Sequence, residues 1–398
     1  MESAPSRGVR EIFSLYGPQY LRDHKLPEHH RKTMFALQHC RTAVLGGHVD
    51  KCDKCGYTHV FYNSCRNRHC PLCQGLNSIK WVDKLSATLL PVSYFHIVFT
   101  IPSELNRMAT INQECLYDIL FKAASESLLM LAKDPKHLGV RTGMVAVLHT
   151  WGQNMMEHPH LHTLVPAGGW SDIGQCWQHS SEKFFIPVKV ISSVFRGKFL
   201  AFLKDAYNKG EIKFEGEIKP LQRKNNFKKL LDTVYGKPWV VFAEKPFTNA
   251  IHVVKYLARY SNRVAIGNSR IESIEHNEIR FRWKDYKSHG LHRVMNLPAP
   301  EFIRRFLLHV LPKGFCKIRY FGIFAVRHRK TLLLQCSKAL DYQSPKSKFE
   351  GLTWQGALQL ASGIDVCKCP VCKTGTMKTI MIMDRFRGPP LENIVLGL

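Results

Sequence analysis

The sequence predicts an α+β fold in which antiparallel strands alternate with helices. Short stretches rich in β-forming residues alternate between apolar and polar positions, and longer stretches repeat apolar residues at helical spacing. Prolines and glycines separate these stretches. The same breaks divide the chain into an N-terminal helical and cysteine-rich domain (1–90), a central domain (91–300) and a basic C-terminal region (301–398).

Apolar spacing predicts the helices, and β-rich stretches predict the strands. Pro91 ends the first long helix, while Ser103 and Thr248 are suitable N-caps. In the first part of the chain we expect a mostly helical segment over 1–50, a helix over 77–90, a strand over 92–100 and a helical region over 104–132. In the middle we expect strands over 143–151 and 159–165 with a turn at 155–157, and helices over 194–207 and around 219–229. The last expected elements are a strand over 239–242, a helix over 247–262, a hairpin over 271–283 turning at 275–277, and a helix over 302–311.

The composition indicates a globular protein that binds a polyanion. The 398 residues include 57 Lys and Arg against 31 Asp and Glu, a formal net charge of +26, and 45% are hydrophobic. This composition excludes general disorder, and the charge favours nucleic acid as a partner. No apolar run reaches about 18 residues, and the first 20 residues lack the apolar core of a secretory signal. We therefore expect a cytoplasmic protein with no membrane partner.

Most of the 13 cysteines lie in two short segments, which favours metal binding over disulfides in the cytoplasm. Two CxxC pairs, separated by 14 residues, have the spacing of a tetrahedral zinc site. The expected structural Zn²⁺ ligands are Cys52, Cys55, Cys70 and Cys73. Further candidates, as a replacement ligand or for a second ion, are Cys65, His48, His59 and His69.

A third cysteine group near the C-terminus suggests a second zinc site. Cys367, Cys369 and Cys372 repeat the CxxC spacing, and Cys369-Pro-Val-Cys372 resembles Cys70-Pro-Leu-Cys73. The group lacks an obvious second half, to which Cys336 or His328 could contribute.

The segment from Glu157 to Thr163 is the most informative in the chain. His160 and His162 are two positions apart on a predicted strand, so both imidazoles point to the same face. Two neutral imidazoles on one face can hold a divalent metal ion that stays open to substrate.

A helix downstream carries two tyrosines one turn apart. Tyr256 and Tyr260 lie on one helix face, with Lys255, Arg259 and Arg263 nearby. A neighbouring cation or metal ion favours the phenolate, whose attack on a phosphodiester forms a phosphotyrosine and releases a 3′ hydroxyl. The bond energy is kept, so a second strand can be joined without ATP.

Taken together, these motifs resemble a known family. His-hydrophobic-His followed by a helical tyrosine is the signature of HUH single-strand endonucleases. The order here is a cysteine domain, His158-Pro-His-Leu-His162, and then Tyr256-x3-Tyr260, and it resembles the rolling-circle transposases of the insertion sequence 91 family. The resemblance covers nearly the whole chain and includes the segments 62–74 and 149–153.

The resemblance implies a bacterial, nucleoid-associated protein, and it also implies a site and a mechanism. It implies an antiparallel sheet with the histidine strand at its centre and the tyrosine helix packed over it. His160 and His162 would bind Mg²⁺ or Mn²⁺, Tyr256 and Tyr260 would be the nucleophiles, and Gln153 is the expected third ligand, with His149 and His158 as alternatives. The implied activity is metal-dependent nicking and rejoining of single-stranded DNA at element ends, which drives rolling-circle, or peel-and-paste, transposition.

Basic residues mark the expected DNA-binding surface. Residues 302–348 carry 11 Lys and Arg against one acid, interleaved with aromatics that can stack on bases. The zinc domain would help to recognise hairpin or subterminal element-end DNA. The candidate DNA-binding residues are Arg66, Arg68, Lys255, Arg259, Arg263, Arg304, Arg305, Arg327 and Arg329.

Two other functions stay open at this point. One is a plasmid replication initiator or relaxase with the same chemistry, and the other is a zinc-dependent nucleic-acid-binding protein without catalysis. The sequence has no P-loop of the G-x-x-x-x-G-K-[ST] type, so unwinding would depend on host replication or helicase machinery. The oligomeric state, the end sequences and the order in which the tyrosines act are open.

Overall fold

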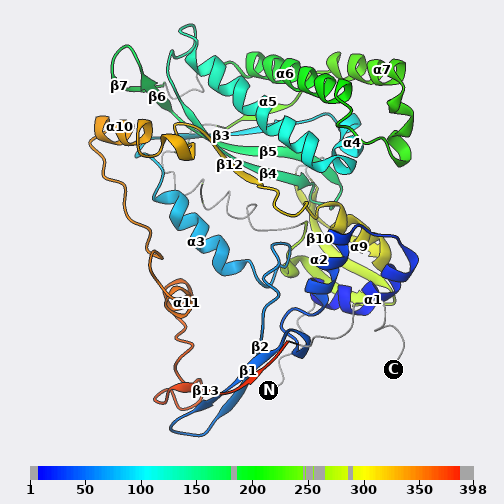
Figure 1. The fold of residues 1–398 in the computed structure, drawn as a ribbon, viewed down its shortest axis with the longest axis vertical. Helices are drawn as coiled ribbons and strands as arrows, with labels where there is room; N and C mark the ends of the chain where they lie inside the picture. Colours follow the sequence, from blue (N-terminus) through cyan, green and yellow to red (C-terminus); the bar gives the residue numbers. More distant parts are fainter. Residues whose placement is uncertain are drawn as a thin grey trace.

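A five-stranded antiparallel sheet forms the centre of the computed structural model, which describes residues 8–180, 186–244, 247, 254, 265–285 and 290–385. The strand order is β12-β4-β5-β3-β8 (Figure 1). The strands are β3 (Tyr94–Thr100), β4 (Gly143–Trp151), β5 (Glu157–Pro166), β8 (Val241–Ala243) and β12 (Ile318–Gly322). The predicted histidine strand, β5, is therefore the middle strand of an antiparallel sheet, and the α+β class is confirmed.

Helices cover one face of this sheet (Figure 1). The layer consists of α4 (Asn106–Ile111), α5 (Gln113–Lys133), α6 (Val188–Asn208) and α7 (Lys224–Tyr235). Phe95, Phe99 and Leu161 point from the strands into this layer and are fully buried. Since burying one large apolar side chain contributes about 1.5–3 kcal/mol, this interface is a main source of stability.

The opposite face of the sheet carries a second core. Tyr94, Val145 and Leu164 are buried there, and Leu164 shares the face of His160 and His162 because the three are two residues apart on β5. The elements that contribute to this core are α3 (Gly75–Ser86), the hairpin of β6 (Gly168–Ser171) and β7 (Cys176–His179), and α10 (Leu332–Ala339).

The N-terminal helices pack against a helix from far along the chain. The helices α1 (Val9–Asp23) and α2 (Glu28–Gln38) pack on α9 (Ala299–Leu308), where Phe13 and Phe306 make an edge-to-face contact with ring centroids 5.2 Å apart. The adjoining sheet has the order β11-β10-β9. Its strands are β9 (Ile271–Glu275), β10 (Glu278–Asp285) and β11 (Leu291–Pro298).

A third small sheet joins the N-terminal cysteine region to the C-terminal one. Its order is β13-β1-β2, with β1 (Gly47–Cys52) in the middle, β2 (Thr58–Tyr62) on one side and β13 (Met377–Met383) on the other. The chain reaches β13 from α10 through α11 (Trp354–Ser362), alongside α3 (Figure 1). Short 3-10 helices complete the described elements: η1 (Ala43–Leu45), η2 (Ser103–Leu105), η3 (Gly216–Gln222), η4 (Asn268–Arg270) and η6 (Val326–His328).

Several predicted elements differ from the observed ones in extent. The helical region expected over 104–132 is broken at Asn112, whose side chain forms two hydrogen bonds with the backbone of Lys213, at 2.7 and 3.0 Å. The hairpin over 271–283 turns at His276 and Asn277, which adopt φ of 49° and 66°. The helix expected over 247–262 lies outside the described residues except for Phe247 and Val254, and Val254 is helical and buried in the core on the histidine face.

The predicted domain limits 1–90, 91–300 and 301–398 stay predictions. The structure adds that β12, from the third segment, pairs with β4 of the second. Within the ranges described above, every helix is too short or too polar to span a bilayer.

His309 joins the end of α9 to the turn between β4 and β5. The imidazole is buried, and its Nε2 and Nδ1 lie 3.1 Å from the carbonyl of Met155 and from Oγ1 of Thr150. Since only a ring N–H can bond the carbonyl, Nε2 donates there and Nδ1 accepts from the Thr150 hydroxyl. The neutral imidazole therefore fits both partners.

We expect the free energy of unfolding to fall as the pH drops below 6.5. Burial lowers the pKa of His309 to about 4, whereas an unfolded histidine titrates near 6.5, so the unfolded chain takes up the proton first. The stabilising contribution is complete above pH 6.5 and is lost as the pH falls toward 4, by about 2 kcal/mol at pH 5. Thermal unfolding should therefore show a shallower pH dependence between pH 7 and 5 in His309→Gln than in the unchanged chain. Parallel slopes would contradict the assignment.

Candidate active site and cysteine clusters

The middle strand holds the two predicted histidine ligands in the expected arrangement. His160 and His162 are buried on the same face of β5, and their Nε2 atoms lie 3.1 Å apart. The strand has neighbours on both sides, so its register fixes the direction of both side chains.

His149 completes a group of three imidazoles. It pairs with His160 across β4 and β5, and its Nδ1 lies 3.3 Å from Nε2 of His160. One nitrogen from each of His149, His160 and His162 lies within 4.8 Å of the others.

The expectation that Gln153 faces His160 is wrong. Trp151 is already paired with Glu157, so the turn occupies Gly152 to Met156 rather than 155–157, and Gln153 lies in it. Its backbone carbonyl accepts a hydrogen bond from Arg270. His149, named as an alternative, has the position across the strands.

For His160 and His162, hydrogen bonds on the far side of the ring indicate which nitrogen carries the lone pair that faces the group. Nδ1 of His160 donates to the carbonyl of His158, at 2.5 Å, so its Nε2 keeps a lone pair. Nδ1 of His162 lies 2.9 Å from Nε2 of His96, and Nδ1 of His96 lies 3.0 Å from a carboxylate oxygen of Glu244. Since the carboxylate can only accept, His96 donates to Glu244 and accepts from His162. The lone pair of His162 therefore also points into the group.

The three imidazoles are neutral at pH 7. Burial is the main cause that lowers the pKa of His160 to about 3, and burial together with the neighbouring imidazoles holds the pKa of His149 and His162 well below the usual 6.5. Neutral imidazoles are the form that coordinates a metal ion.

The spacing of these nitrogens fits a single cation. Adjacent ligands of an octahedral ion with bonds of about 2.1 Å are about 3.0 Å apart. The observed separations of 3.1 and 3.3 Å are close to that value. Metal-ligating histidines commonly donate their other ring N–H to an acceptor that fixes the ring, and here the acceptors are the carbonyl of His158 and the imidazole of His96, which Glu244 orients.

A lysine stands next to both the histidine group and the cysteine-rich region. Lys317 precedes β12, and its backbone carbonyl accepts a hydrogen bond from the N–H of Leu148 on β4. Its charge contributes to lowering the pKa of His149 and of His69, while burial lowers its own pKa to about 7. An anion at the site would favour the charged ammonium.

The arginines predicted to bind DNA differ in their environments. Arg68 donates to the carbonyls of Phe315 and Pro312, at 2.6 and 3.2 Å, so it ties the cysteine-rich region to the loop before β12. Arg305 is mostly buried between Glu301 and the carbonyl of Asn154, and Arg304 forms two hydrogen bonds with Glu301.

The other predicted DNA-binding arginines are more accessible or lie outside the described residues. Arg66 and Arg327 are exposed, and the guanidinium of Arg329 lies 5.0 Å from the ring centre of Tyr320. The remaining predicted residues of this kind, and both candidate nucleophiles, lie outside the described residues: Lys255, Arg259, Arg263, Tyr256 and Tyr260.

The predicted cysteine set is divided between two clusters, so its grouping is wrong. Cys70 and Cys73 join Cys40 and Cys65, whereas Cys52 and Cys55 join Cys369 and Cys372. Two CxxC turns that are 14 residues apart can share one ion, or each can bind a separate ion together with other cysteines. Spacing alone does not distinguish these two arrangements.

The first cluster lies wholly in the N-terminal region. Sγ of Cys40 is 3.5 Å from that of Cys73 and 3.6 Å from that of Cys70, and Cys65 is 3.6 Å from Cys73. Cys65, a further candidate, is therefore a member, while Cys40 was missed because it stands alone, 30 residues before the CxxC pair of this cluster.

Other candidate metal ligands are not in these clusters of the described residues. Cys367 is exposed, and of the three C-terminal cysteines only Cys369 and Cys372 join the second cluster. The further candidates outside the clusters are Cys336, His328, His48, His59 and His69.

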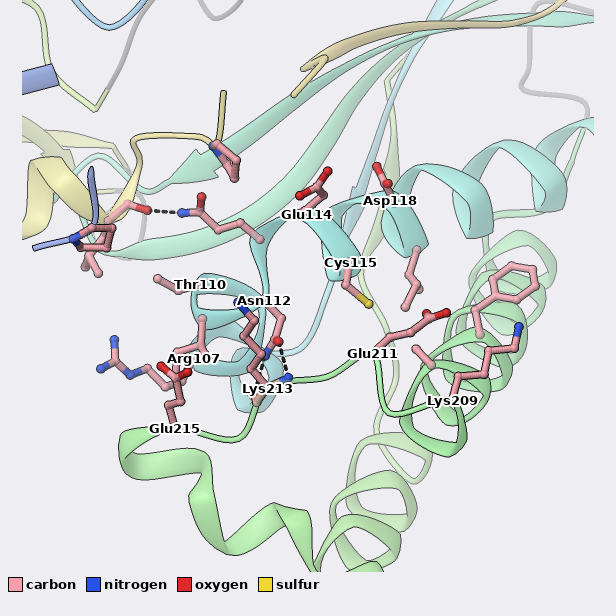
Figure 2. A pocket seen from close by; sticks show the side chains of 18 of the residues that line it. Arg107, Thr110, Asn112, Glu114, Cys115, Asp118, Lys209, Glu211, Lys213 and Glu215 are labelled. Atoms are coloured by element: carbon pink, nitrogen blue, oxygen red, sulfur yellow. Dashed lines mark hydrogen bonds between the residues drawn. The ribbon is translucent and has the colours of Figure 1, made fainter. Parts of the chain in front are cut away.

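A separate hollow lies beside α4, α5 and α6 (Figure 2). It is lined by charges of both signs, including Glu114, Asp118, Glu211 and Lys213, and shares no residue with the histidine or cysteine groups. Mixed charges offer no uniform attraction for a phosphate chain, so the histidine group is the better candidate for chemistry on DNA.

A histidine-lined antiparallel sheet joined to a tetrathiolate domain is the architecture that the sequence motifs led us to expect. Two family models match the chain, one described as "Putative transposase" over residues 143–331 and one as "Transposase zinc-binding domain" over residues 12–101. They cover the histidine strand and the first cysteine cluster.

Known transposases match over nearly the full length. The chain is 43% identical over 394 residues to "Putative transposase y4qJ" of Sinorhizobium fredii (strain NBRC 101917 / NGR234), covering 96% of this chain and 97% of that one. It is 26% identical over 358 residues to the "Transposase for insertion sequence element IS801" of Pseudomonas savastanoi pv. phaseolicola, covering 88% and 83%. No solved structure is significantly similar. The chain belongs to the transposase family of insertion sequence 91.

His96 and Glu244 are site residues that sequence reasoning did not find. His96 lies on β3, opposite Leu164, and Glu244 follows β8, and neither belongs to a recognisable motif. The only signal in the sequence was a histidine in an otherwise apolar strand. Such a histidine is more often a core residue with a hydrogen-bond partner than a part of a functional site.

Replacing Glu244 with alanine should weaken metal binding. The change removes the acceptor that fixes His96 and, through it, the lone pair of His162, so we expect the affinity for Mn²⁺ to fall about 10-fold. Isothermal titration of the full chain would measure it. Glu275→Ala, an exposed carboxylate at the end of β9, is the matched control and should bind as the unchanged chain does. Equal affinities in both variants would show that Glu244 does not orient the site.

Proposed function

We propose that this transposase nicks and rejoins single-stranded DNA at the ends of an insertion sequence through a 5′-phosphotyrosine intermediate. The observation that carries the proposal is the buried group of His160 and His162 on the middle strand and His149 on the adjacent β4, with the lone pairs of His160 and His162 facing inward. The family membership and the paired tyrosines of the sequence support it.

The three histidines would hold a divalent ion, Mg²⁺ or Mn²⁺. The ion would supply Lewis-acid stabilisation of the negative charge that develops on the phosphodiester oxygens. Imidazole ligands suit transition metals better than Mg²⁺, so of the two ions this site favours Mn²⁺. His96 and Glu244 keep His162 in the required tautomer.

Tyr256 or Tyr260 would be the nucleophile. Its oxygen attacks phosphorus while the bond to the 3′ oxygen breaks, the phenolic proton is lost to solvent, and the departing 3′ oxygen takes up a proton. The products are a 5′-phosphotyrosine and a free 3′ hydroxyl. Attack by a 3′ hydroxyl on the adduct reverses these bond changes and joins the new strand.

Two tyrosines suit rolling-circle transposition. One can keep the first adduct at an element end while the other serves the target or the second end. Val254, two residues before Tyr256, is helical and buried in the core on the histidine face, which is consistent with a tyrosine helix over that face. Strand separation would be supplied by the host replication or helicase machinery.

The nucleophile assignment predicts a covalent product. The full chain incubated with Mn²⁺ and single-stranded DNA carrying an element end should form an adduct that survives denaturing electrophoresis. We expect Tyr256→Phe with Tyr260→Phe to form none, because no phenolic oxygen remains in the motif. An adduct in the double variant would exclude both tyrosines.

The same assay tests the third ligand. His149→Ala should lower the adduct yield at least 100-fold, whereas Gln153→Ala, in the adjacent turn, should stay within a few-fold of the unchanged chain. The reverse order of effects would restore Gln153 as the ligand.

Binding of single-stranded DNA should weaken steeply with salt. We expect Lys317, whose charge acts on His149, to contribute to phosphate binding, so Lys317→Met should lower affinity and reduce the slope of log K against log salt by about 0.7. Fluorescence anisotropy between 50 and 200 mM salt would measure both. Lys204→Met, an exposed lysine of α6 on the helical layer, is the matched control with an unchanged slope. A flat dependence in the unchanged chain would exclude a phosphate-based interface.

A further inference from the structure

The second cysteine cluster is formed by the two ends of the chain. Cys52 and Cys55 come from the turn between β1 and β2, while Cys369 and Cys372 come from a turn just before β13. Residues 52 and 372 are 320 positions apart, and their sulfurs are 3.7 Å apart. The family model for the zinc-binding domain ends at residue 101 and so includes only half of this cluster.

We propose that this cluster is a second structural zinc site, which fastens the C-terminal segment to the N-terminal zinc domain. Sulfurs bound to one zinc at about 2.3 Å lie about 3.8 Å apart along the edges of a tetrahedron, whereas a disulfide is about 2.05 Å long. The pairs Cys52–Cys372 and Cys55–Cys369 are separated by 3.7 and 3.6 Å. Four thiolates at this spacing are a closed zinc site and not a pair of disulfides.

The two turns have the same construction. In each, the N–H of the first cysteine bonds to a carbonyl beyond the second, from Cys52 to Tyr57 at 2.8 Å and from Cys369 to Gly375 at 2.9 Å. The residue after the second cysteine adopts a left-handed conformation in both turns, with φ of 73° at Gly56 and 61° at Lys373.

Backbone N–H groups point at the sulfurs in both turns. The N–H of Cys55 lies 3.5 Å from Sγ of Cys52, and that of Gly375 lies 3.3 Å from Sγ of Cys372. Such contacts favour the thiolate form that binds zinc. Two matching turns that face each other across one ion form a zinc ribbon assembled from distant halves.

The two halves fit each other closely. Gly375 has no room for a side chain, because a Cβ there would lie 2.3 Å from Sγ of Cys52. Asp53 accepts from the N–H of Thr376 at 2.8 Å and donates its own N–H to the Thr376 carbonyl at 3.1 Å. The carboxylate of Asp53 also pairs with Lys378, at 3.5 Å.

Between α10 and the second cysteine cluster, few contacts hold this C-terminal segment in place. In α11 the buried residue is Ala357, and nearby Asp83 on α3 accepts from the hydroxyl of Ser347 and the N–H of Lys348, at 2.6 and 2.9 Å. Figure 1 shows the segment between α10 and β13 as a thin strap beside α3. Because the strap itself buries so little apolar surface, it is held at this end by the metal cluster together with the pairing of β13 with β1.

Metal content of the purified full chain tests the site directly. Native mass spectrometry together with elemental analysis should find two zinc ions per chain, one in Cys369→Ser with Cys372→Ser, and two in Cys367→Ser, an exposed neighbouring cysteine outside the cluster. One zinc in the unchanged chain, two in the double variant, or iron in place of zinc would overturn the proposal.

Alkylation of the unchanged chain tests it without any substitution. Cys367 and Cys316 should react at once, while Cys52, Cys55, Cys369 and Cys372 should become reactive together when a chelator removes zinc. Immediate reaction of Cys369 and Cys372 would overturn the proposal. Neither measurement involves DNA, so the outcome is independent of the proposed nicking activity.

Discussion

The register between β4 and β5 is the constraint on which the candidate site depends. It places His149 opposite His160 and, because side chains alternate along a strand, turns His162 to the same face. A slip of β5 by one residue would turn His160 and His162 into the apolar layer under α5 and α6, on the opposite face from His149. That register is fixed on both sides: β3 and β12 extend the sheet, and the turn between β4 and β5 is anchored by His309 and Arg305.

The anchors of that turn link the site to the rest of the molecule. Arg305 lies in α9 and His309 directly follows this helix, which packs against the N-terminal helices. Arg68, from the cysteine-rich region, donates a hydrogen bond to the loop that leads into β12. Lys317 in this loop contributes to the electrostatics of both His149 and His69. The zinc domain and the histidine sheet therefore share a boundary of specific polar contacts.

The sequence predicted what depends on local pattern and missed what depends on distant partners. The strand 143–151, the histidine strand and the helix 194–207 follow from period and propensity, and all three are present with only small changes in their limits. To identify the third imidazole, the position of the turn between β4 and β5 had to be known. The predicted turn was a few residues off, so Gln153 was expected opposite His160, where the structure has His149. The pairing of Cys52 with Cys372, and of His96 with Glu244, is set by chain topology. The spacing of residues within a motif contains no information about such distant partners. The strands β12 and β13 were missed for the same reason, because short strands become recognisable only beside the partners that they extend.

The pairing of β13 with β1 has a consequence for synthesis of the protein. A ribosome adds about 5–20 residues per second, so β1 leaves the ribosome on the order of tens of seconds before β13 exists. During that interval one edge of β1 and the thiols of Cys52 and Cys55 lack their final partners. Unpaired strand edges and reactive thiols invite association with other chains. A chain that stops before Cys369 therefore cannot close this sheet, and the cysteine cluster of a nascent transposase stays incomplete until β13 and the turn before it have been made.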